Sequence, residues 1–155
     1  MPLHVITSLQ DPLLNLLADD PIRPEIPASF RVSTNTLIFV LQNNDTLEPE
    51  AAVCVAFRDF VPADILELAR DPDGLAPVAV FYTIWSYRSG AARRLLNGVV
   101  RWIRRNRSEV VEFVTLSPQT DMAHRFHTKN GALEWRRNGD TVNYLYSVLD
   151  EGENH

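Results

Sequence analysis

The chain has 155 residues and a mass of 17.6 kDa, enough for one complete hydrophobic core and too little for two ordinary domains. Hydrophobic residues make up 45% and charged residues 23%, and no apolar stretch approaches the roughly 20 residues that span a bilayer. The net charge of −5 argues against a general nucleic-acid binder. Because residues 1–10 lack the basic and apolar regions of a signal peptide, we expect a cytoplasmic protein without a membrane partner.

Residues 1–30 are punctuated by proline. The prolines are Pro2, Pro12, Pro21, Pro24 and Pro27. Between them, the leucines within 13–17 allow a short amphipathic helix, which Asp11 would cap with Pro12 at its first position. We therefore expect residues 1–30 to form an arm or lid that packs on a body made of residues 31–155.

Apolar periodicity predicts the elements of this body. In chain order they are a strand at 36–41, a strand at 52–57, a helix at 62–70, a strand at 78–85, a helix at 91–105, a strand at 110–116, a helix at 120–130, and a closing hairpin of strands 133–137 and 142–148. The strand at 78–85 is apolar on both faces and should be central. The order predicts an α/β fold in which helices cover a mixed sheet.

Arginines concentrate between Arg88 and Arg107, where there are seven of them and no acidic residue. The other 135 residues therefore carry a net charge of −12, from −5 minus 7. A positive segment inside an acidic protein indicates a local site for a polyanion, and phosphate is the commonest such ligand.

A turn of small residues joins the strand at 78–85 to the start of the helix at 91–105. Exposed amides and the positive end of the helix dipole favour an anion there. The turn resembles the acyl-CoA pyrophosphate loop of the GNAT acetyltransferases. Gly90 and Ala92 fit that pattern, whereas Tyr87 stands where the family has a basic residue. The resemblance implies that the ligand binds Arg88, Ser89, Gly90, Ala91, Ala92, Arg93 and Arg94. The alternative is an ordinary arginine face on a surface helix.

Ser117 directly follows the predicted strand at 110–116, and His127 lies ten residues later in the next short helix. If that helix folds back beside the strand, the hydroxyl and the imidazole can meet as a nucleophile or proton relay. Taken singly, Ser117 could be a helix cap and His127 a packed core residue. A metal site on Asp121, His124 and His127 is disfavoured, because ligands at this spacing drift around the helix. The single cysteine, Cys54, lies between valines and is expected to be buried and inert.

The last third of the chain resembles malonyl-CoA decarboxylases. The matching segments are Phe126-His127, Asn130-Gly131-Ala132, Trp135-Arg136-Arg137-Asn138 and Asn143-Tyr144-Leu145-Tyr146. Upstream, Phe81-Tyr82-Thr83-Ile84 is similar to the family's Phe-Tyr-Ser-Ile strand, and Leu116-Ser117-Pro118 matches its Leu-Ser-Pro motif. The resemblance covers residues 36–150 and is most specific at the tail. It implies a GNAT-like fold.

Carried over residue by residue, the resemblance makes Ser117 and His127 the catalytic pair and Tyr146 an active-site tyrosine. Asn130 and Asn143 become supports of the site. The chain departs from the family in three ways. Within these 155 residues we expect no counterpart of the family's large N-terminal helical domain, of its helical insertion between the Leu-Ser-Pro motif and the histidine, or of its acidic residue near the start of the phosphate-loop helix.

The sequence is compatible with three functions. The first is decarboxylation of malonyl-CoA, or a related malonyl thioester, to acetyl-CoA and CO₂, with no metal and no cofactor beyond the thioester itself. The second is a GNAT acyltransferase, whose acceptor cleft Glu48, Glu50 and Asp59 could line. The third is a non-catalytic acyl-CoA sensor. The expected partner is a small acyl-CoA, without nucleic acid, and a homo-oligomer is left open.

Overall fold

The computed structural model describes residues 2–146. Its strands are β1 (Leu3–Ile6), β2 (Thr36–Gln42), β3 (Pro49–Arg58), β4 (Val78–Ser86), β5 (Glu112–Thr115), β6 (Ser117–Pro118), β7 (Leu133–Arg137) and β8 (Thr141–Leu145). Its helices are the 3₁₀ helix η1 (Pro12–Asp19), α1 (Ala28–Arg31), α2 (Ile65–Leu68), α3 (Ala91–Asn106) and α4 (Asp121–Lys129).

The strands form one mixed sheet in the order β1-β2-β3-β4-β5-β8-β6, and β7 pairs with β8. All of the strand pairs are antiparallel except β4 with β5. A parallel pair needs a long crossover connection, which α3 supplies between β4 and β5. The mixed α/β fold predicted from the order of elements is confirmed.

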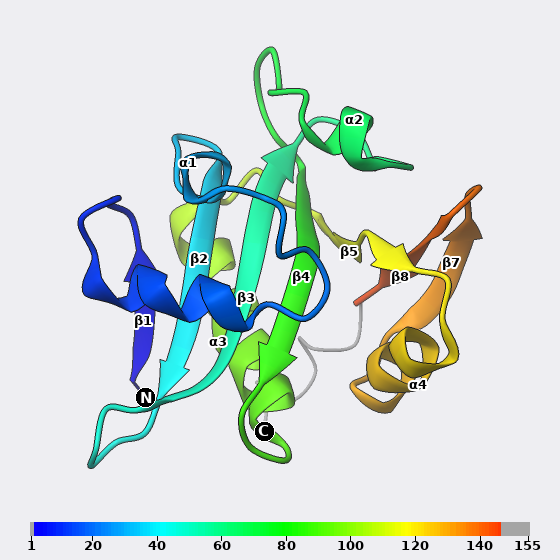
Figure 1. Cartoon of the computed structure of the whole chain (residues 1–155). Coiled ribbons are helices and arrows are strands. Elements are labelled where there is room, and N and C mark those ends of the chain that lie inside the picture. The colour runs from blue at the N-terminus through cyan, green and yellow to red at the C-terminus, as the bar shows by residue number, and fades with distance from the viewer. Residues whose placement is uncertain (1, 147–155) are drawn as a thin grey trace.

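Both faces of the sheet are covered (Figure 1), with α3 behind it and the N-terminal segment that carries η1 in front. On β2, Leu37 and Phe39 belong to the core under α3, whereas Ile38 and Val40 belong to the core under the N-terminal segment. This alternation is the two-residue period of a strand. It explains why β2 to β4 read as continuous apolar runs.

The central strands β4 and β5 separate partway along their length. Their register runs from Val78 opposite Glu112 to Phe81 opposite Thr115 and ends there. β4 continues to Ser86, while the chain after β5 turns to pair with β8 through the short strand β6. The fork between these strands positions the candidate site described below.

Several elements differ from the sequence-based expectations. β1 was not predicted, because it is a four-residue edge strand inside the proline-punctuated segment; the expected arm of residues 1–30 thus contributes one strand to the sheet. The helix expected near 13–17 is a 3₁₀ helix, and the one expected at 62–70 covers only Ile65–Leu68. The strand expected at 110–116 is shorter and is followed by β6. Residues 147 and 148 of the last predicted strand lie outside the described residues.

Candidate functional site

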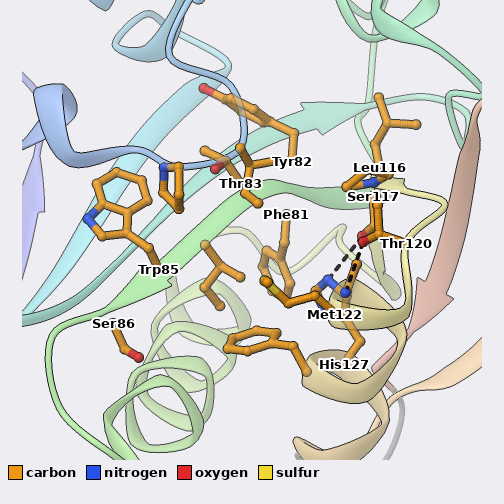
Figure 2. Close-up of a pocket in the computed structure, with 16 residues that line it drawn as sticks. Phe81, Tyr82, Thr83, Trp85, Ser86, Leu116, Ser117, Thr120, Met122 and His127 are labelled. Atoms are coloured by element: carbon orange, nitrogen blue, oxygen red, sulfur yellow. Dashed lines mark hydrogen bonds between the residues drawn. The ribbon is translucent and has the colours of Figure 1, made fainter.

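A cavity of about 280 Å³ lies where β4 and β5 diverge. It is lined by Pro21, Ile22, the β4 residues 81–86, Leu116, Ser117, Pro118, and the α4 residues Thr120, Met122, Ala123, Phe126 and His127. Most of these side chains are apolar (Figure 2), and none of the described lining residues is an aspartate, glutamate, lysine or arginine. The cavity therefore suits a small apolar or weakly polar group.

Ser117 and His127 meet at this cavity. Oγ of Ser117 lies 3.0 Å from Nε2 of His127, and the two residues are only 4% and 6% exposed (Figure 2). The predicted approach of the Ser117 hydroxyl to the His127 imidazole is confirmed. Ser117 is not a helix cap, because it pairs with Val142 in the sheet.

The limits of α4 place His127 beside the strand. Thr120 caps the helix by accepting a hydrogen bond from the Ala123 amide at 3.1 Å. The helix ends at Asn130, and Gly131 follows with φ of 99°, a left-handed conformation that favours glycine. The Asn130 side chain donates to the Phe126 carbonyl at 2.8 Å, so this expected support holds the end of the helix rather than touching the cavity.

Two tyrosines of the last described strand region hold the His127 ring from its far side. Oη of Tyr146 lies 2.7 Å from Nδ1 of His127. The ring of Tyr144 stacks on the imidazole at a centroid distance of 4.8 Å. Burial lowers the pKa of His127 to about 4, so the ring is neutral at pH 7. Burial also raises the pKa of the Tyr146 phenol, which stays protonated.

The second expected support, Asn143, is fully buried and joins β8 to its neighbours. Its Nδ2 donates to the carbonyl of Thr115 at 2.7 Å and to that of Pro62 at 3.0 Å. Its Oδ1 accepts from Arg136 and Asn138, each at 3.0 Å. Asn143 therefore fixes the backbone next to Ser117.

Thr115 is a site residue that the sequence analysis missed. Its Oγ1 accepts a hydrogen bond from Ser117 Oγ at 2.7 Å and another from the Tyr144 amide at 3.0 Å. The signal was present, because residues two apart on an extended chain point to the same side. Thr115, Ser117, His127 and Tyr146 form one chain of hydrogen bonds that is closed to solvent.

The turn before α3 has the shape expected for an anion loop. Gly90 is the N-cap of the helix and has φ of 80°, where a side chain would be strained. No side chain caps this end, and Ala91 and Ala92 are buried. α3 is 16 residues long, so its dipole favours negative charge at this turn.

A carboxylate already occupies part of this positive region. Oε1 of Glu50 lies 3.1 Å from the Arg94 guanidinium, and its Oε2 lies 3.7 Å from Arg88. A hydrogen bond from Asn43 and the two arginines hold the pKa of Glu50 below its usual value. Glu50, which could have lined the acceptor cleft of an acyltransferase, thus lies against the arginines of this turn. Arg93 donates to the Lys129 carbonyl at 3.1 Å, which ties α3 to the end of α4.

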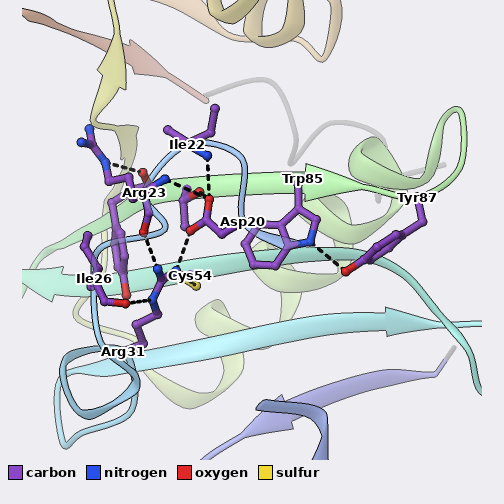
Figure 3. Close-up of polar contacts among 10 residues, drawn as sticks. Asp20, Ile22, Arg23, Ile26, Arg31, Cys54, Trp85 and Tyr87 are labelled. Atoms are coloured by element: carbon purple, nitrogen blue, oxygen red, sulfur yellow. Dashed lines mark hydrogen bonds and ion pairs between the residues drawn. The ribbon is translucent and has the colours of Figure 1, made fainter. Parts of the chain in front are cut away.

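Tyr87, which replaces the basic residue of the GNAT pattern, points away from the loop. Its hydroxyl donates to Asp19 at 2.7 Å. The same hydroxyl accepts a hydrogen bond from the Trp85 indole at 3.0 Å (Figure 3). Tyr87 therefore anchors the N-terminal segment and does not bind an anion at this turn.

The N-terminal segment is tied to the fork between the strands (Figure 3). Arg23 donates to the Tyr82 carbonyl at 3.1 Å and to the Leu116 carbonyl at 2.9 Å, one in β4 and the other directly after β5. Asp20 and Arg31, both fully buried, pair at 2.7 Å, and Thr83 of β4 also donates to Asp20. These bonds place Pro21 and Ile22 in the cavity wall.

Other polar groups do not gather into a metal centre. Within residues 2–146 no group of three histidine, cysteine or acidic side chains is arranged to hold a metal ion. His124 instead lies 3.6 Å from Glu134. Cys54 is buried beside Arg31, and burial raises its pKa to about 11, as an inert thiol requires. The same part of the chain contains no helix long and apolar enough to cross a membrane.

The chain is similar in fold to solved structures, although its sequence matches no family profile. No protein-family profile and no curated protein matches the sequence. Among solved structures, the chain is similar to malonyl-CoA decarboxylases from Agrobacterium vitis (TM-score 0.75, 21% identity) and Rhodopseudomonas palustris (TM-score 0.72, 22% identity). These alignments cover 99% of this chain but only 62% and 61% of the decarboxylases, so the chain spans about three-fifths of their length.

A second group of similar structures consists of acetyltransferases. The aminoglycoside 6′-N-acetyltransferase from Acinetobacter baumannii aligns with a TM-score of 0.63 and 18% identity, over 89% of this chain and 95% of that one. The two groups share the mixed sheet flanked by helices described above. The chain therefore has the GNAT acetyltransferase fold.

Proposed function

We propose that this chain decarboxylates malonyl-CoA, or a related malonyl thioester, to acetyl-CoA and CO₂. The observation that carries the proposal is the hydrogen-bonded pair of Ser117 and His127 at an otherwise apolar cavity. The similarity to decarboxylase structures over 99% of the chain supports it. The enzyme would need no metal and no cofactor beyond the thioester substrate.

The chemistry requires the malonyl group to lie with its carboxylate at the pair. The bond between the carboxylate carbon and the methylene carbon then breaks, its electron pair forms a thioester enolate, and CO₂ leaves. One proton added to the carbon completes the acetyl group. A positioned acid for such a step contributes on the order of 10²–10⁴ in rate. His127 or Ser117 would provide the proton directly, or Tyr146 would provide it through His127.

The apolar lining of the cavity favours decarboxylation over acyl transfer to an amine. A carboxylate is poorly solvated among Phe81, Ile84 and Met122, and losing it as neutral CO₂ removes the charge. Acyl transfer to an amine, in contrast, usually needs a general base beside the acceptor. No carboxylate lines the described cavity to serve as that base.

The diphosphate of CoA would bind at the start of α3. The backbone amides of the first turn of α3 and the guanidinium groups of Arg88 and Arg94 are the ligands we propose. The pantetheine arm would then run from this turn along β4 to the fork.

Acyl transfer is the second candidate, and the likeness to the aminoglycoside acetyltransferase fold favours it. A mixture experiment separates the candidates. The purified protein is incubated with malonyl-CoA, methylmalonyl-CoA and acetyl-CoA, with and without a primary amine, and the thioesters are followed by mass spectrometry. Acetyl-CoA formed from malonyl-CoA without amine supports decarboxylation. Acylated amine supports transfer, and unchanged, tightly bound thioesters support a sensor.

A further inference from the structure

We infer that Thr115 is a positioning residue that fixes the tautomer of His127, so that Nε2 carries the proton and faces Ser117 as a hydrogen-bond donor. The tautomer itself follows from the geometry of four buried side chains. Its catalytic consequence, that the site offers a proton donor instead of an activated serine nucleophile, rests on the proposed function.

The Ser117 hydroxyl has a single proton, which it can donate to only one neighbour at a time. Ser117 Oγ donates to Thr115 Oγ1 at 2.7 Å. That proton cannot also be donated to His127, whose Nε2 lies 3.0 Å from the same oxygen. The second contact is a hydrogen bond only if Nε2 carries a proton and Ser117 Oγ accepts it.

The contact of Nδ1 of His127 with Tyr146 agrees with a proton on Nε2. His127 is buried and neutral at pH 7, so it holds one proton, and Nδ1 is then an acceptor. Tyr146 Oη, 2.7 Å away, supplies the matching donor because its phenol stays protonated. Each contact is then a hydrogen bond with one donor and one acceptor: Tyr146 donates to His127, His127 donates to Ser117, and Ser117 donates to Thr115.

Thr115 can fix this direction because its oxygen is itself held in place. The amide of Tyr144 donates to Thr115 Oγ1 at 3.0 Å, across the junction of β5 with β8. Thr115 is fully buried, and Asn143 binds its carbonyl. A backbone amide and the Ser117 hydroxyl thus occupy both lone pairs of a threonine oxygen that cannot move to another partner.

This arrangement is the reverse of a serine nucleophile activated by histidine. Such a pair needs Nε2 unprotonated, to take the serine proton. Here Nε2–H would instead donate to the carboxylate or to the enolate of a malonyl group, as a neutral imidazole does when it polarises a carbonyl. A covalent acyl-serine intermediate is then not part of the reaction.

Two nearly isosteric variants test the role of Thr115. Thr115→Ser keeps the hydroxyl, whereas Thr115→Val removes it at almost the same volume. The ¹⁵N spectrum of labelled His127, recorded without substrate at pH 7, reports which ring nitrogen is protonated. We expect Nε2–H in the unmodified chain and in Thr115→Ser. In Thr115→Val, the Ser117 proton turns to Nε2, and the ring proton moves to Nδ1.

The second readout is the rate at which a fluorophosphonate labels Ser117. In this reaction the serine oxygen displaces fluoride from phosphorus, and the serine proton passes to an unprotonated Nε2 of His127. We expect slow labelling in the unmodified chain and in Thr115→Ser. Labelling should be faster in Thr115→Val by on the order of 10², at the low end of what a general base supplies. Ser117→Ala should abolish it.

An unmodified chain with Nδ1–H would overturn the inference, even if Thr115→Val failed to fold. Equal spectra and labelling rates for Thr115→Ser and Thr115→Val would overturn it as well. Neither readout uses malonyl-CoA. A chain that holds Nε2–H but releases no CO₂ therefore contradicts the proposed function and leaves the tautomer assignment standing.

Discussion

The hydroxyl of Tyr146 lies 2.7 Å from Nδ1 of His127, on the side of the imidazole opposite Ser117. Tyr146 is 2% exposed and does not line the cavity, so it reaches a bound ligand only through the histidine. The family resemblance placed this tyrosine in the active site, and the geometry makes it the residue that orients the ring.

Replacing Tyr146 with phenylalanine should therefore lower kcat more than it raises KM. The change leaves Nδ1 of His127 buried without its donor, a loss of about 1–3 kcal/mol, or roughly tenfold to a hundredfold in rate. Tyr144→Phe is the matched control, because it keeps the stacked ring and removes only a contact of 3.4 Å with His124. Steady-state kinetics on malonyl-CoA measure both. Equal effects of the two variants would argue against an orienting role for Tyr146.

The neutral state of His127 makes the stability of the fold depend on pH. Between its ordinary pKa of 6.5 and its folded pKa of about 4, the unfolded chain takes up a proton that the folded chain does not. Stability from this group is thus complete above pH 6.5 and is lost as the pH falls toward 4, by roughly 3 kcal/mol. Urea unfolding at pH 7.0 and 4.5 should show this loss in the unmodified chain and in His124→Gln. His127→Gln should show a much smaller loss, and an equal loss there would contradict the assignment.

If the CoA diphosphate binds at the start of α3 as proposed, the Glu50 carboxylate would compete with it for Arg88 and Arg94. Glu50→Gln should free Arg88 and Arg94 and lower the Kd of CoA by up to about fivefold, since pairs with exposed arginines are weak. The neighbouring Glu48→Gln, at an exposed position without these contacts, is the control. Isothermal titration with CoA measures the change. Weaker binding to Glu50→Gln would mean that the carboxylate holds the arginines in their binding positions.

The buried ion pair of Asp20 and Arg31 anchors the segment that forms part of the cavity wall. Asp20→Ala leaves the fully buried Arg31 without its partner and should reduce the free energy of unfolding by about 3–5 kcal/mol. The adjacent Asp19 is exposed and binds only the Tyr87 hydroxyl among the described contacts, so Asp19→Ala should cost about 1 kcal/mol or less. Denaturant unfolding of both variants checks this, and a small effect of Asp20→Ala would show that the segment is not held by the pair.

The sequence predicted those parts of the site that depend on local periodicity. Local residues mark both a strand that runs up to Ser117 and a helix that begins near Thr120 and ends before Gly131. The approach of Ser117 to His127 could therefore be anticipated. Thr115 could have been added from the two-residue period of the strand. The parallel pairing of β4 and β5 could likewise have been added, because a helix lies between them in the sequence.

The contacts that the sequence could not predict join residues far apart in the chain. Arg23 binds carbonyl groups 59 and 93 residues away, and Arg94 binds Glu50 44 residues away. Nothing in the local pattern around these residues identifies such partners. β1 was missed for a related reason, because a short edge strand is defined by its pairing with β2 more than by its own four residues.

If the buried Ser117–His127 pair carries the reaction, then the release of CO₂ from malonyl-CoA depends on His127. The unmodified chain and His127→Ala are each mixed with carboxyl-labelled malonyl-CoA, and CoA binding is measured in parallel. We expect CO₂ and acetyl-CoA from the unmodified chain, and no CO₂ release by His127→Ala despite a nearly unchanged affinity for CoA. Undiminished CO₂ release by His127→Ala, or none by the unmodified chain with CoA bound, would contradict it.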